Sequence, residues 1–318
     1  MERGRRDDQG GGRLVQLQYR DVQPPAVLRL QERVDRIPVR LGQREKRNPR
    51  THPTLRPQPV AGEVWTLTFP PELITLLLRT SNLVALTGAG VSQESGLRTF
   101  RDAQDGLWKQ YKPEDLASPQ AFARDPKLVW DWYAWRREAV KAVRPNPGHY
   151  ALVEIAKRVP NFTLITQNVD GLHQLAAQTL KVFETFRVLE LHGNIQRVRC
   201  SECYTFTETW DDDTESVPRC EVCGGLLRPD VVWFGEALPR DQLEAAVEAA
   251  RSCEVFFSIG TSGVVQPAAS LAYAARNRGA TLIEINAEPT PLTLKANYFF
   301  QGKSGEILPE LVEAVWGA

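Results

Sequence analysis

Short apolar runs alternate with amphipathic stretches from Pro70 to the end of the chain. The runs are rich in Val, Ile, Leu and Phe and are short, which predicts strands buried on both faces. We expect these strands at residues 83–87, 162–166, 188–191, 231–234, 255–260 and 281–286. The amphipathic stretches predict helices at residues 125–143, 147–159, 240–252, 267–278 and 304–316, after a first helix that Pro70 and Pro71 open. This alternation predicts an α/β fold, a doubly wound Rossmann-like parallel sheet.

A polar, cysteine-bearing insert interrupts this rhythm at about residues 195–230. Two Cys-x-x-Cys pairs lie in it, 16 residues apart, a spacing typical of structural zinc sites. The expected metal ligands are Cys200, Cys203, Cys220 and Cys223. Four thiolates leave no open coordination position, so we expect one structural zinc ion in a small inserted module.

Residues 1–62 differ from the rest of the chain. They hold 14 Lys and Arg against 7 Asp and Glu, and few apolar positions recur with any period. Such a segment buries too little to offset its ordering entropy, which predicts a disordered basic extension before a catalytic domain at 63–318. A solvated extension is the simpler interpretation, and binding of nucleic acid or a transit receptor is the alternative.

Charge and hydropathy exclude several classes of protein. The whole chain has 39 Lys and Arg and 39 Asp and Glu, so a generally basic nucleic-acid binder is not expected. Acidic residues surround the cysteines and would repel phosphate. The sequence has no run of about 18 apolar residues that could span a membrane, and its N-terminus lacks the apolar run of a secretory signal. We expect a cytoplasmic monomer without membrane contact.

Polar residues follow four of the expected strands, at the carboxyl ends where open α/β sheets bind ligands. The first cluster is Gly88-Ala89-Gly90-Val91-Ser92, whose glycines would let the backbone approach a phosphate or would serve a plain tight turn. The other clusters are Gln167-Asn168-Val169-Asp170, Gly260-Thr261-Ser262 and Asn286-Ala287-Glu288. Each alone could be a helix cap or a turn. Together they predict the rim of a nucleotide crevice.

One of the four histidines, His192, directly follows an expected strand, in His192-Gly193-Asn194. A lone histidine is more often structural than catalytic. At a strand's carboxyl end, however, an imidazole with a near-neutral pKa could act as a general base on a sugar hydroxyl.

Tyr133 and Arg136 are three residues apart in an expected helix and therefore share a face. A guanidinium can hold a carboxylate through two parallel hydrogen bonds, and a phenol can add a third. The alternative is aromatic core packing, because Trp130, Trp132 and Trp135 crowd the same segment. We interpret Tyr133 and Arg136 as ligands of an acidic group.

In their order along the chain, these motifs resemble those of the sirtuins, the NAD-dependent protein-lysine deacylases. The resemblance covers roughly residues 73–315 and includes Gly96-Leu-Arg-Thr-Phe-Arg101 and Phe234-Gly-Glu236. Tyr133-Ala-Trp-Arg136 is similar to the Tyr-x-x-Arg of the desuccinylase and demalonylase-type (class III) branch. One departure is Arg98-Thr99-Phe100, where the family more commonly has Pro-Asp-Phe.

The resemblance implies that NAD is consumed as a co-substrate. The acyl-lysine oxygen would attack the ribose carbon as nicotinamide leaves, His192 would deprotonate a ribose hydroxyl, and the products would be lysine, nicotinamide and O-acyl-ADP-ribose. The implied NAD-binding residues are Gly88, Ala89, Gly90, Ser92, Phe100, Arg101, Gln167, Asn168, Asp170, Gly260, Thr261, Ser262, Asn286, Ala287, Glu288 and Ser304. The implied acyl-lysine and peptide contacts are Ala117, Tyr133, Arg136, Val232, Phe234, Gly235 and Glu236.

Two other functions remain open at this point. A protein ADP-ribosyltransferase would use the same NAD site, and a zinc-ribbon module could bind a partner without catalysis. A Rossmann dehydrogenase fits poorly, because no acidic residue about 20 positions after the glycines closes a second strand in the expected way. The expected partners are proteins that carry acylated lysine side chains.

Overall fold

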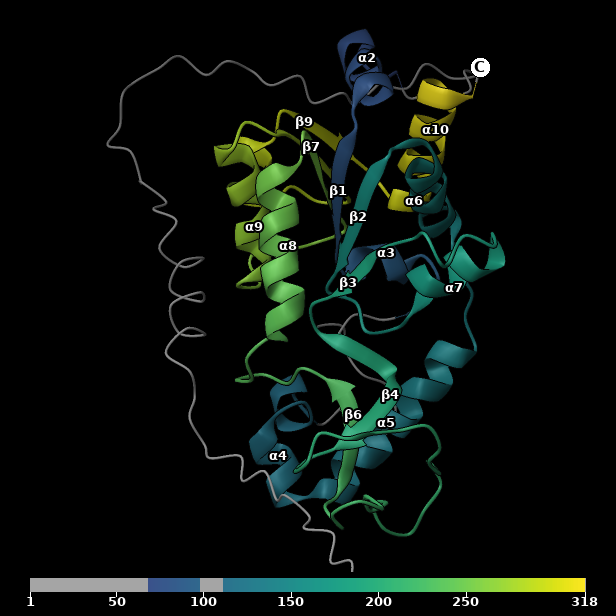
Figure 1. The fold of residues 1–318 in the computed structure, drawn as a ribbon, viewed down its shortest axis with the longest axis vertical. Coiled ribbons are helices and arrows are strands. Elements are labelled where there is room, and N and C mark those ends of the chain that lie inside the picture. Colours follow the sequence, from purple (N-terminus) through teal and green to yellow (C-terminus); the bar gives the residue numbers. More distant parts are fainter. Residues whose placement is uncertain (1–67, 98–110, 318) are drawn as a thin grey trace, which may run out of the picture.

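The computed structural model describes residues 68–97 and 111–317. The basic extension predicted for residues 1–62 lies outside this part of the chain. The described residues form two lobes, which Figure 1 shows one above the other. The large lobe contains a six-stranded sheet and the small lobe a three-stranded one.

The large lobe confirms the predicted doubly wound parallel sheet. Every neighbouring pair of its strands is parallel, in the order β3-β2-β1-β7-β8-β9. In chain order the strands are β1 (Asn82–Thr87), β2 (Asn161–Thr166), β3 (Val188–Glu190), β7 (Val255–Ile259), β8 (Thr281–Asn286) and β9 (Tyr298–Gln301). The carboxyl ends of β1, β2, β7 and β8 therefore lie side by side.

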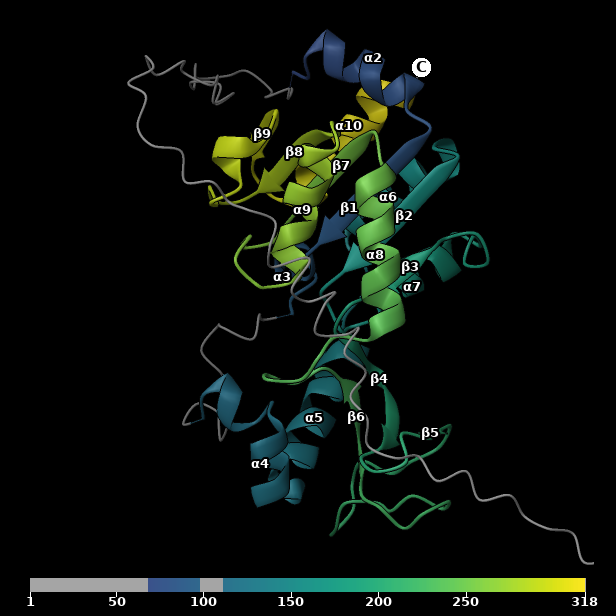
Figure 2. The same cartoon turned by 60° about the vertical axis from the view of Figure 1, so that its left-hand side comes forward.

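Helices cover both faces of this sheet because its central strands carry mostly apolar side chains on both faces. In β1, Leu83 and Ala85 enter one core while Val84 and Leu86 enter the other, as the two-residue period of a strand requires. The first core is closed by α2 (Pro71–Arg79), α6 (Pro147–Arg158), α7 (Leu172–Thr179) and α10 (Ser304–Trp316). The second is closed by α8 (Arg240–Ser252) and α9 (Ala268–Asn277), which Figures 1 and 2 show on the opposite side.

The small lobe comprises residues 113–141 and 193–231, two segments far apart in the sequence. Its antiparallel sheet has the order β5-β4-β6, with β4 (Gly193–Cys200), β5 (Phe206–Thr207) and β6 (Leu227–Val231). The helices α4 (Pro119–Arg124) and α5 (Pro126–Lys141) pack against this sheet. The insert expected at 195–230 is thus one half of a larger lobe.

One expected strand was wrong. The strand placed at residues 231–234 ends at Val231 and begins at Leu227, and residues 233–236 form a turn in which Glu236 N–H donates to the Trp233 carbonyl. Pro229 lies within β6, which is an edge strand, and edge strands tolerate proline because one side of their backbone is unpaired. The shortest remaining elements are α3 (Ala89–Gln93), η2 (Pro113–Asp115) and η3 (Thr293–Lys295).

Within residues 68–97 and 111–317, every helix is too short or too polar to cross a membrane.

Candidate active site

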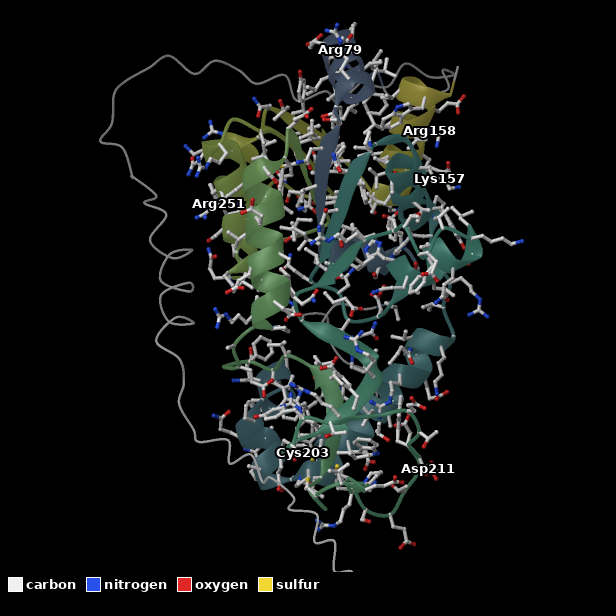
Figure 3. The ribbon with its side chains drawn as sticks, in the orientation of Figure 1. Arg79, Lys157, Arg158, Cys203, Asp211 and Arg251 are labelled. Carbon is white, nitrogen blue, oxygen red and sulfur yellow. The ribbon has the colours of Figure 1, made fainter. Side chains whose placement is uncertain are left out.

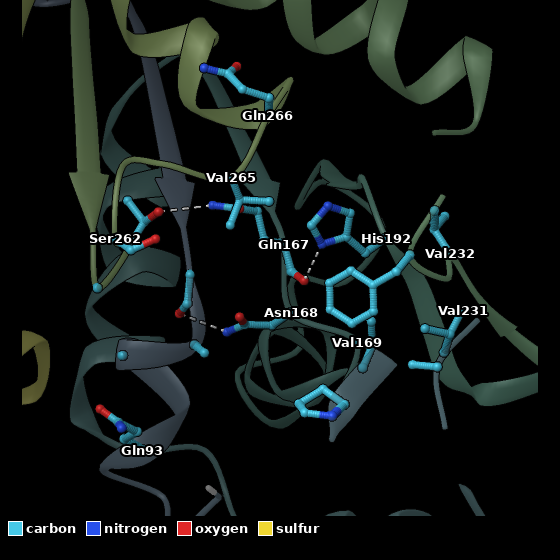
Figure 4. Close-up of a pocket in the computed structure, with 18 of the residues that line it drawn as sticks. Gln93, Gln167, Asn168, Val169, His192, Val231, Val232, Ser262, Val265 and Gln266 are labelled. Carbon is cyan, nitrogen blue, oxygen red and sulfur yellow. Dashed lines mark hydrogen bonds between the residues drawn. The ribbon is translucent and has the colours of Figure 1, made fainter. Parts of the chain in front are cut away.

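A cavity of about 750 Å³ lies at the carboxyl ends of the parallel strands and is lined by both lobes. From the large lobe, the strand-end clusters at Gly88–Gly90, Gln167–Val169, Gly260–Ser262 and Asn286–Glu288 line it, as does His192. From the small lobe and the loop after β6 come Ala117, Tyr133 and residues 231–236. Figure 4 shows Gln167, Asn168 and His192 on one wall and Val232 nearby. The structure therefore gathers most of the predicted site residues.

Gly88 and Gly90 allow the loop after β1 to lie against the loop after β7. Gly90 N–H donates to the Gly260 carbonyl at 2.8 Å. A Cβ on Gly88 would stand 2.7 Å from the Gly260 oxygen, and one on Gly90 would stand 2.8 Å from the Gly260 Cα. The glycines thus bring two backbone loops together at the cavity wall, with Ala89 between them.

Three side-chain amides are held in fixed directions around the cavity. Gln167 Nε2 donates to Thr261 Oγ1 at 3.1 Å, and Asn168 Nδ2 donates to the Gly88 carbonyl at 3.1 Å (Figure 4). On the far side, Asn286 Nδ2 donates to the Thr261 carbonyl at 3.2 Å. These bonds join the loops after β1, β2, β7 and β8, so the cavity wall is preorganised.

Ser92 and Asp170 lie behind Asn168, outside the cavity lining. Ser92 Oγ donates to the Asp170 carboxylate at 2.7 Å, and Leu172 N–H donates to the same group at 2.9 Å. Asn168 Nδ2 in turn donates to Ser92 Oγ at 3.0 Å. Burial raises the pKa of Asp170 above its usual range. This network fixes the Asn168 amide from behind, and Asp170 also accepts the first backbone N–H of α7.

His192 is positioned as a base. Its Nδ1 lies 3.0 Å from the Gln167 carbonyl oxygen, which can only accept, so Nδ1 carries the proton and neutral Nε2 keeps its lone pair. Burial lowers the pKa of His192 below its usual value, and the bond to Gln167 partly opposes that shift. The ring is therefore neutral, and able to accept a proton, at neutral pH.

A second cavity of about 410 Å³ adjoins the first at Gly90, Gly260, Asn286 and Ala287. Ser304 lines this second cavity, together with Gln93, Glu94 and Lys303. Glu94 accepts hydrogen bonds from Ser304 Oγ at 2.7 Å and from Gly305 N–H at 3.0 Å. Sequence analysis missed Glu94 because its role depends on α10, more than 200 residues away.

Tyr133 reaches the cavity wall, and Arg136 lies one helical turn further along α5. Tyr133 is fully buried and burial raises its pKa well above its usual value. The Arg136 guanidinium carbon lies 5.3 Å from the Trp132 ring centre. Burial lowers the pKa of Arg136, while its interactions with the nearby Tyr133 and Asp170 side chains oppose that shift. The predicted pair therefore lies on one face, with the hydroxyl nearest the cavity.

The loop after β6 carries the expected peptide contacts. Val232 N–H donates to the His192 carbonyl and Phe234 N–H to the Ala117 carbonyl, each at 2.9 Å. Phe234 is half exposed. The Glu236 carboxylate is bound to Arg228 at 2.6 and 2.9 Å. Gly235 has a φ of +89°, which favours glycine in this turn.

The sequence analysis missed Trp233, which it placed in a strand. Val265 and Gln266, on the cavity lining near Ser262 in Figure 4, were also missed, because nothing in their types signals a site. Phe100 and Arg101 lie outside the described residues.

The four cysteines form a cluster at the end of the small lobe away from the parallel sheet, where Figure 3 labels Cys203. Cys200 Sγ lies 3.5 Å from Cys223 Sγ, and Cys203 Sγ lies 3.7 Å from Cys220 Sγ. Tetrahedral Zn–S bonds of about 2.3 Å put sulfurs about 3.8 Å apart, so this donor set fits zinc. Glu202 N–H donates to Cys200 Sγ at 3.3 Å, as expected for a thiolate.

Comparison with known proteins identifies related sequences. The Sir2 family matches residues 88–267. The "NAD-dependent protein deacylase" of Aquifex aeolicus is 51% identical over 236 residues, which cover 73% of this chain and 94% of that protein. The "NAD-dependent protein deacylase 2" of Pyrobaculum aerophilum is 52% identical over 241 residues, which cover 76% and 93%.

Solved structures share the fold. A crystal structure of a Sir2 homolog–NAD complex has a TM-score of 0.72 at 47% identity, covering 78% of this chain and 94% of that one. A mutant Sir2 homologue with 2′-O-acetyl ADP ribose has a TM-score of 0.71 at 48% identity, covering 78% and 96%. A structure of Sir2 bound to acetylated peptide has a TM-score of 0.64 at 28% identity, covering 76% and 96%.

Proposed function

The chain belongs to the Sir2 family, and from this premise we propose that it is an NAD-dependent protein-lysine deacylase. Its relatives are named NAD-dependent protein deacylases, and related structures hold NAD or acetylated peptide. The observation that carries the proposal is His192, a neutral imidazole with a free Nε2 on the wall of a cavity large enough for a dinucleotide. The products are free lysine, nicotinamide and O-acyl-ADP-ribose.

The lining residues divide the site between the two substrates. Gln167 and Asn168 hold the nicotinamide and its ribose beside His192, while the Gly88–Gly90 loop faces the pyrophosphate. Thr261, Ser262, the Asn286–Glu288 turn and Ser304 receive the adenosine half. Val232, Phe234 and Gly235 receive the peptide as an added strand, and Glu236 supports their loop through Arg228.

The acyl group enters between Ala117 and Tyr133, and we propose a preference for succinyl and malonyl groups. Ala117 has a small side chain and leaves room for a longer acyl chain. Tyr133 supplies a hydroxyl on the wall, and Arg136 supplies positive charge from the next turn of α5. Both could bind a carboxylate, which an acetyl group lacks.

Zinc is held by the four cysteines and stabilises the small lobe. Cys200 and Cys220 belong to the same core as Trp130 of α5, so the metal site and α5 are packed together. Because α5 carries Tyr133, the metal contributes to the shape of the acyl site without touching substrate. We propose that the protein acts as a monomer on proteins with acylated lysines, which light scattering would test.

The decisive experiment measures nicotinamide release from NAD with matched acetyl-, succinyl- and malonyl-lysine peptides. Wild-type protein should require both NAD and acyl peptide, and His192→Ala should abolish turnover while keeping its zinc content and its circular dichroism. Retained turnover in His192→Ala would refute the assignment of the base. Labelled ADP-ribose on protein, with no free acyl-ADP-ribose, would instead identify an ADP-ribosyltransferase.

The acyl preference has its own test. Arg136→Met should lower kcat/KM for the succinyl peptide by an amount that corresponds to about 2–3 kcal/mol of lost transition-state stabilisation, the value of a hydrogen bond to a charged group. The kcat/KM for the acetyl peptide should fall far less. Lys141→Met is the matched control, because Lys141 is an exposed cation of the same helix whose side chain forms an ion pair with Glu138. Equal losses on both peptides would show that Arg136 does not bind the carboxylate.

A further inference from the structure

Trp233 connects the peptide-binding loop to helix α5. Its side chain is 3% exposed, and its indole Nε1 donates to the Tyr133 hydroxyl oxygen at 3.0 Å. Both residues line the large cavity, although they are 100 positions apart in the sequence. This hydrogen bond joins side chains from the two segments of the cavity wall, beside the backbone bond from Phe234 N–H to the Ala117 carbonyl.

The direction of this bond decides what Tyr133 can do. An indole N–H can only donate, so the phenol oxygen accepts and its own proton must be given to another group. Among residues 68–97 and 111–317, the structure shows no acceptor for that proton. A fully buried hydroxyl with an unused proton is costly unless a ligand accepts it. Tyr133 is thus a donor directed at the occupant of the cavity.

Trp233 itself is held from three sides. The Arg228 guanidinium carbon lies 3.3 Å from the centre of the indole ring, and the Phe122 ring centre lies 5.2 Å away. Glu236 binds Arg228 and also accepts the Trp233 backbone N–H at 2.8 Å. The indole is buried between Arg228 and Phe122, and its backbone N–H is bound to Glu236, so these contacts restrict the direction of its side-chain N–H.

We propose that Trp233 is a positioning residue that sets the acyl selectivity of this site. Its N–H donates to the Tyr133 oxygen, so the phenol O–H points away from the indole. The phenol proton can then be donated to the carboxylate of an acyl group. An acetyl group has no acceptor at that depth and gains nothing from the arrangement. This inference rests on the proposed function and names the residue through which Tyr133 selects its acyl group.

The test replaces the donor and leaves the ring. Trp233→Phe removes the N–H, and benzothienylalanine at position 233 removes it with the shape of the ring unchanged. We expect each to raise KM for a succinyl-lysine peptide about tenfold, with kcat little changed and the acetyl-lysine peptide within about twofold. Trp210→Phe is the matched control, because it removes an indole donor to Asp212 in the same lobe, outside the cavity.

A second pair of measurements separates positioning from general damage. In a Tyr133→Phe background, Trp233→Phe should cause no further loss on the succinyl peptide, because the two residues act through one hydroxyl. Additive losses, equal losses on both peptides, or an unchanged succinyl KM would each overturn the proposal. Calorimetric binding of the succinyl- and acetyl-lysine peptides reports the same selectivity without turnover. Absence of NAD-dependent turnover in the wild type would refute the proposed function, and the binding data would still decide the role of Trp233.

Discussion

Asp212→Asn should uncouple the cysteine-bearing loop from α5. Asp212 receives two hydrogen bonds from Arg137, one of them from Nε at 2.9 Å. The Arg137 side chain is 1% exposed, and its guanidinium carbon lies 5.1 Å from the Trp130 ring centre and 5.8 Å from that of Trp210. The substitution keeps the size of the side chain, removes its charge and replaces one acceptor oxygen by an NH2 group. A buried guanidinium would then lack a counter-ion.

The magnitude follows from the burial of the two partners. Breaking a deeply buried pair costs about 3–5 kcal/mol, because the remaining charge is left uncompensated. The Asp212 side chain is 19% exposed, so water can partly solvate the vacated side. We therefore expect Asp212→Asn to lower the free energy of unfolding by about 2–3 kcal/mol.

The assay is urea unfolding of the zinc-loaded protein, with zinc content measured in parallel. The double variant Arg137→Met/Asp212→Asn should be more stable than Asp212→Asn alone, because no charge remains buried. Asp213→Asn, an exposed neighbour, is the matched control. A loss below about 0.5 kcal/mol, or a double variant whose loss equals the sum of the single losses, would refute this reasoning.

Three further predictions concern titration and metal. Burial lowers the pKa of His192, and a general base must be neutral to accept a proton. As the pH is lowered, kcat/KM should therefore fall with a midpoint below pH 6.5. A midpoint above pH 6.5 in a pH–rate profile would contradict this prediction. Burial lowers the pKa of His149 from 6.5 to about 4, so the unfolded state binds more protons between these values. The free energy of unfolding should therefore decrease by up to about 3 kcal/mol as pH falls from 6.5 to 4, whereas His149→Gln should remove that part of the slope in denaturant titrations. Cys220→Ser should lose zinc in a metal assay and lower the melting temperature, and full zinc retention would contradict four-cysteine ligation.

The large sheet could be predicted because each of its main strands is a short apolar run that is recognisable from the local sequence. Residues 83–87 are apolar, lie between polar positions and match β1. The strand-end clusters could then be placed together, since parallel strands end at one edge. The family resemblance read from these motifs is confirmed by the related sequences.

The small lobe could not be predicted in the same way. Its central strand β4 mixes Gln, Arg and Asn with apolar residues, and β6 contains Pro229, so neither strand is an apolar run of the kind that marks the large sheet. Arg137 directly follows Arg136 in the sequence, yet its side chain is buried among two tryptophans and Asp212. Contacts between segments 75 positions apart leave no periodic signal in the sequence.

The Sir2-type acyl site also depends on a contact that local pattern hides. The sequence pattern placed Trp233 in a strand, and the role we propose for it depends on the orientation of its N–H toward α5. The approach of Gly88 and Gly90 to the backbone of Gly260 was likewise not predicted, because the sequence analysis considered only a phosphate or a tight turn there. The role of each of these residues depends on its contacts with distant segments, and these contacts are known only from the fold.

His192 lies at the seam between the two lobes. The strand β3 ends at Glu190 and β4 begins at Gly193, so only Leu191 and His192 link the two sheets at this point. Its ring is tied to the large lobe through Gln167, and its backbone carbonyl is tied to the loop after β6 through Val232. His192 is therefore held by hydrogen bonds from both sides of the seam, so the orientation of its imidazole depends on the relative placement of the two lobes.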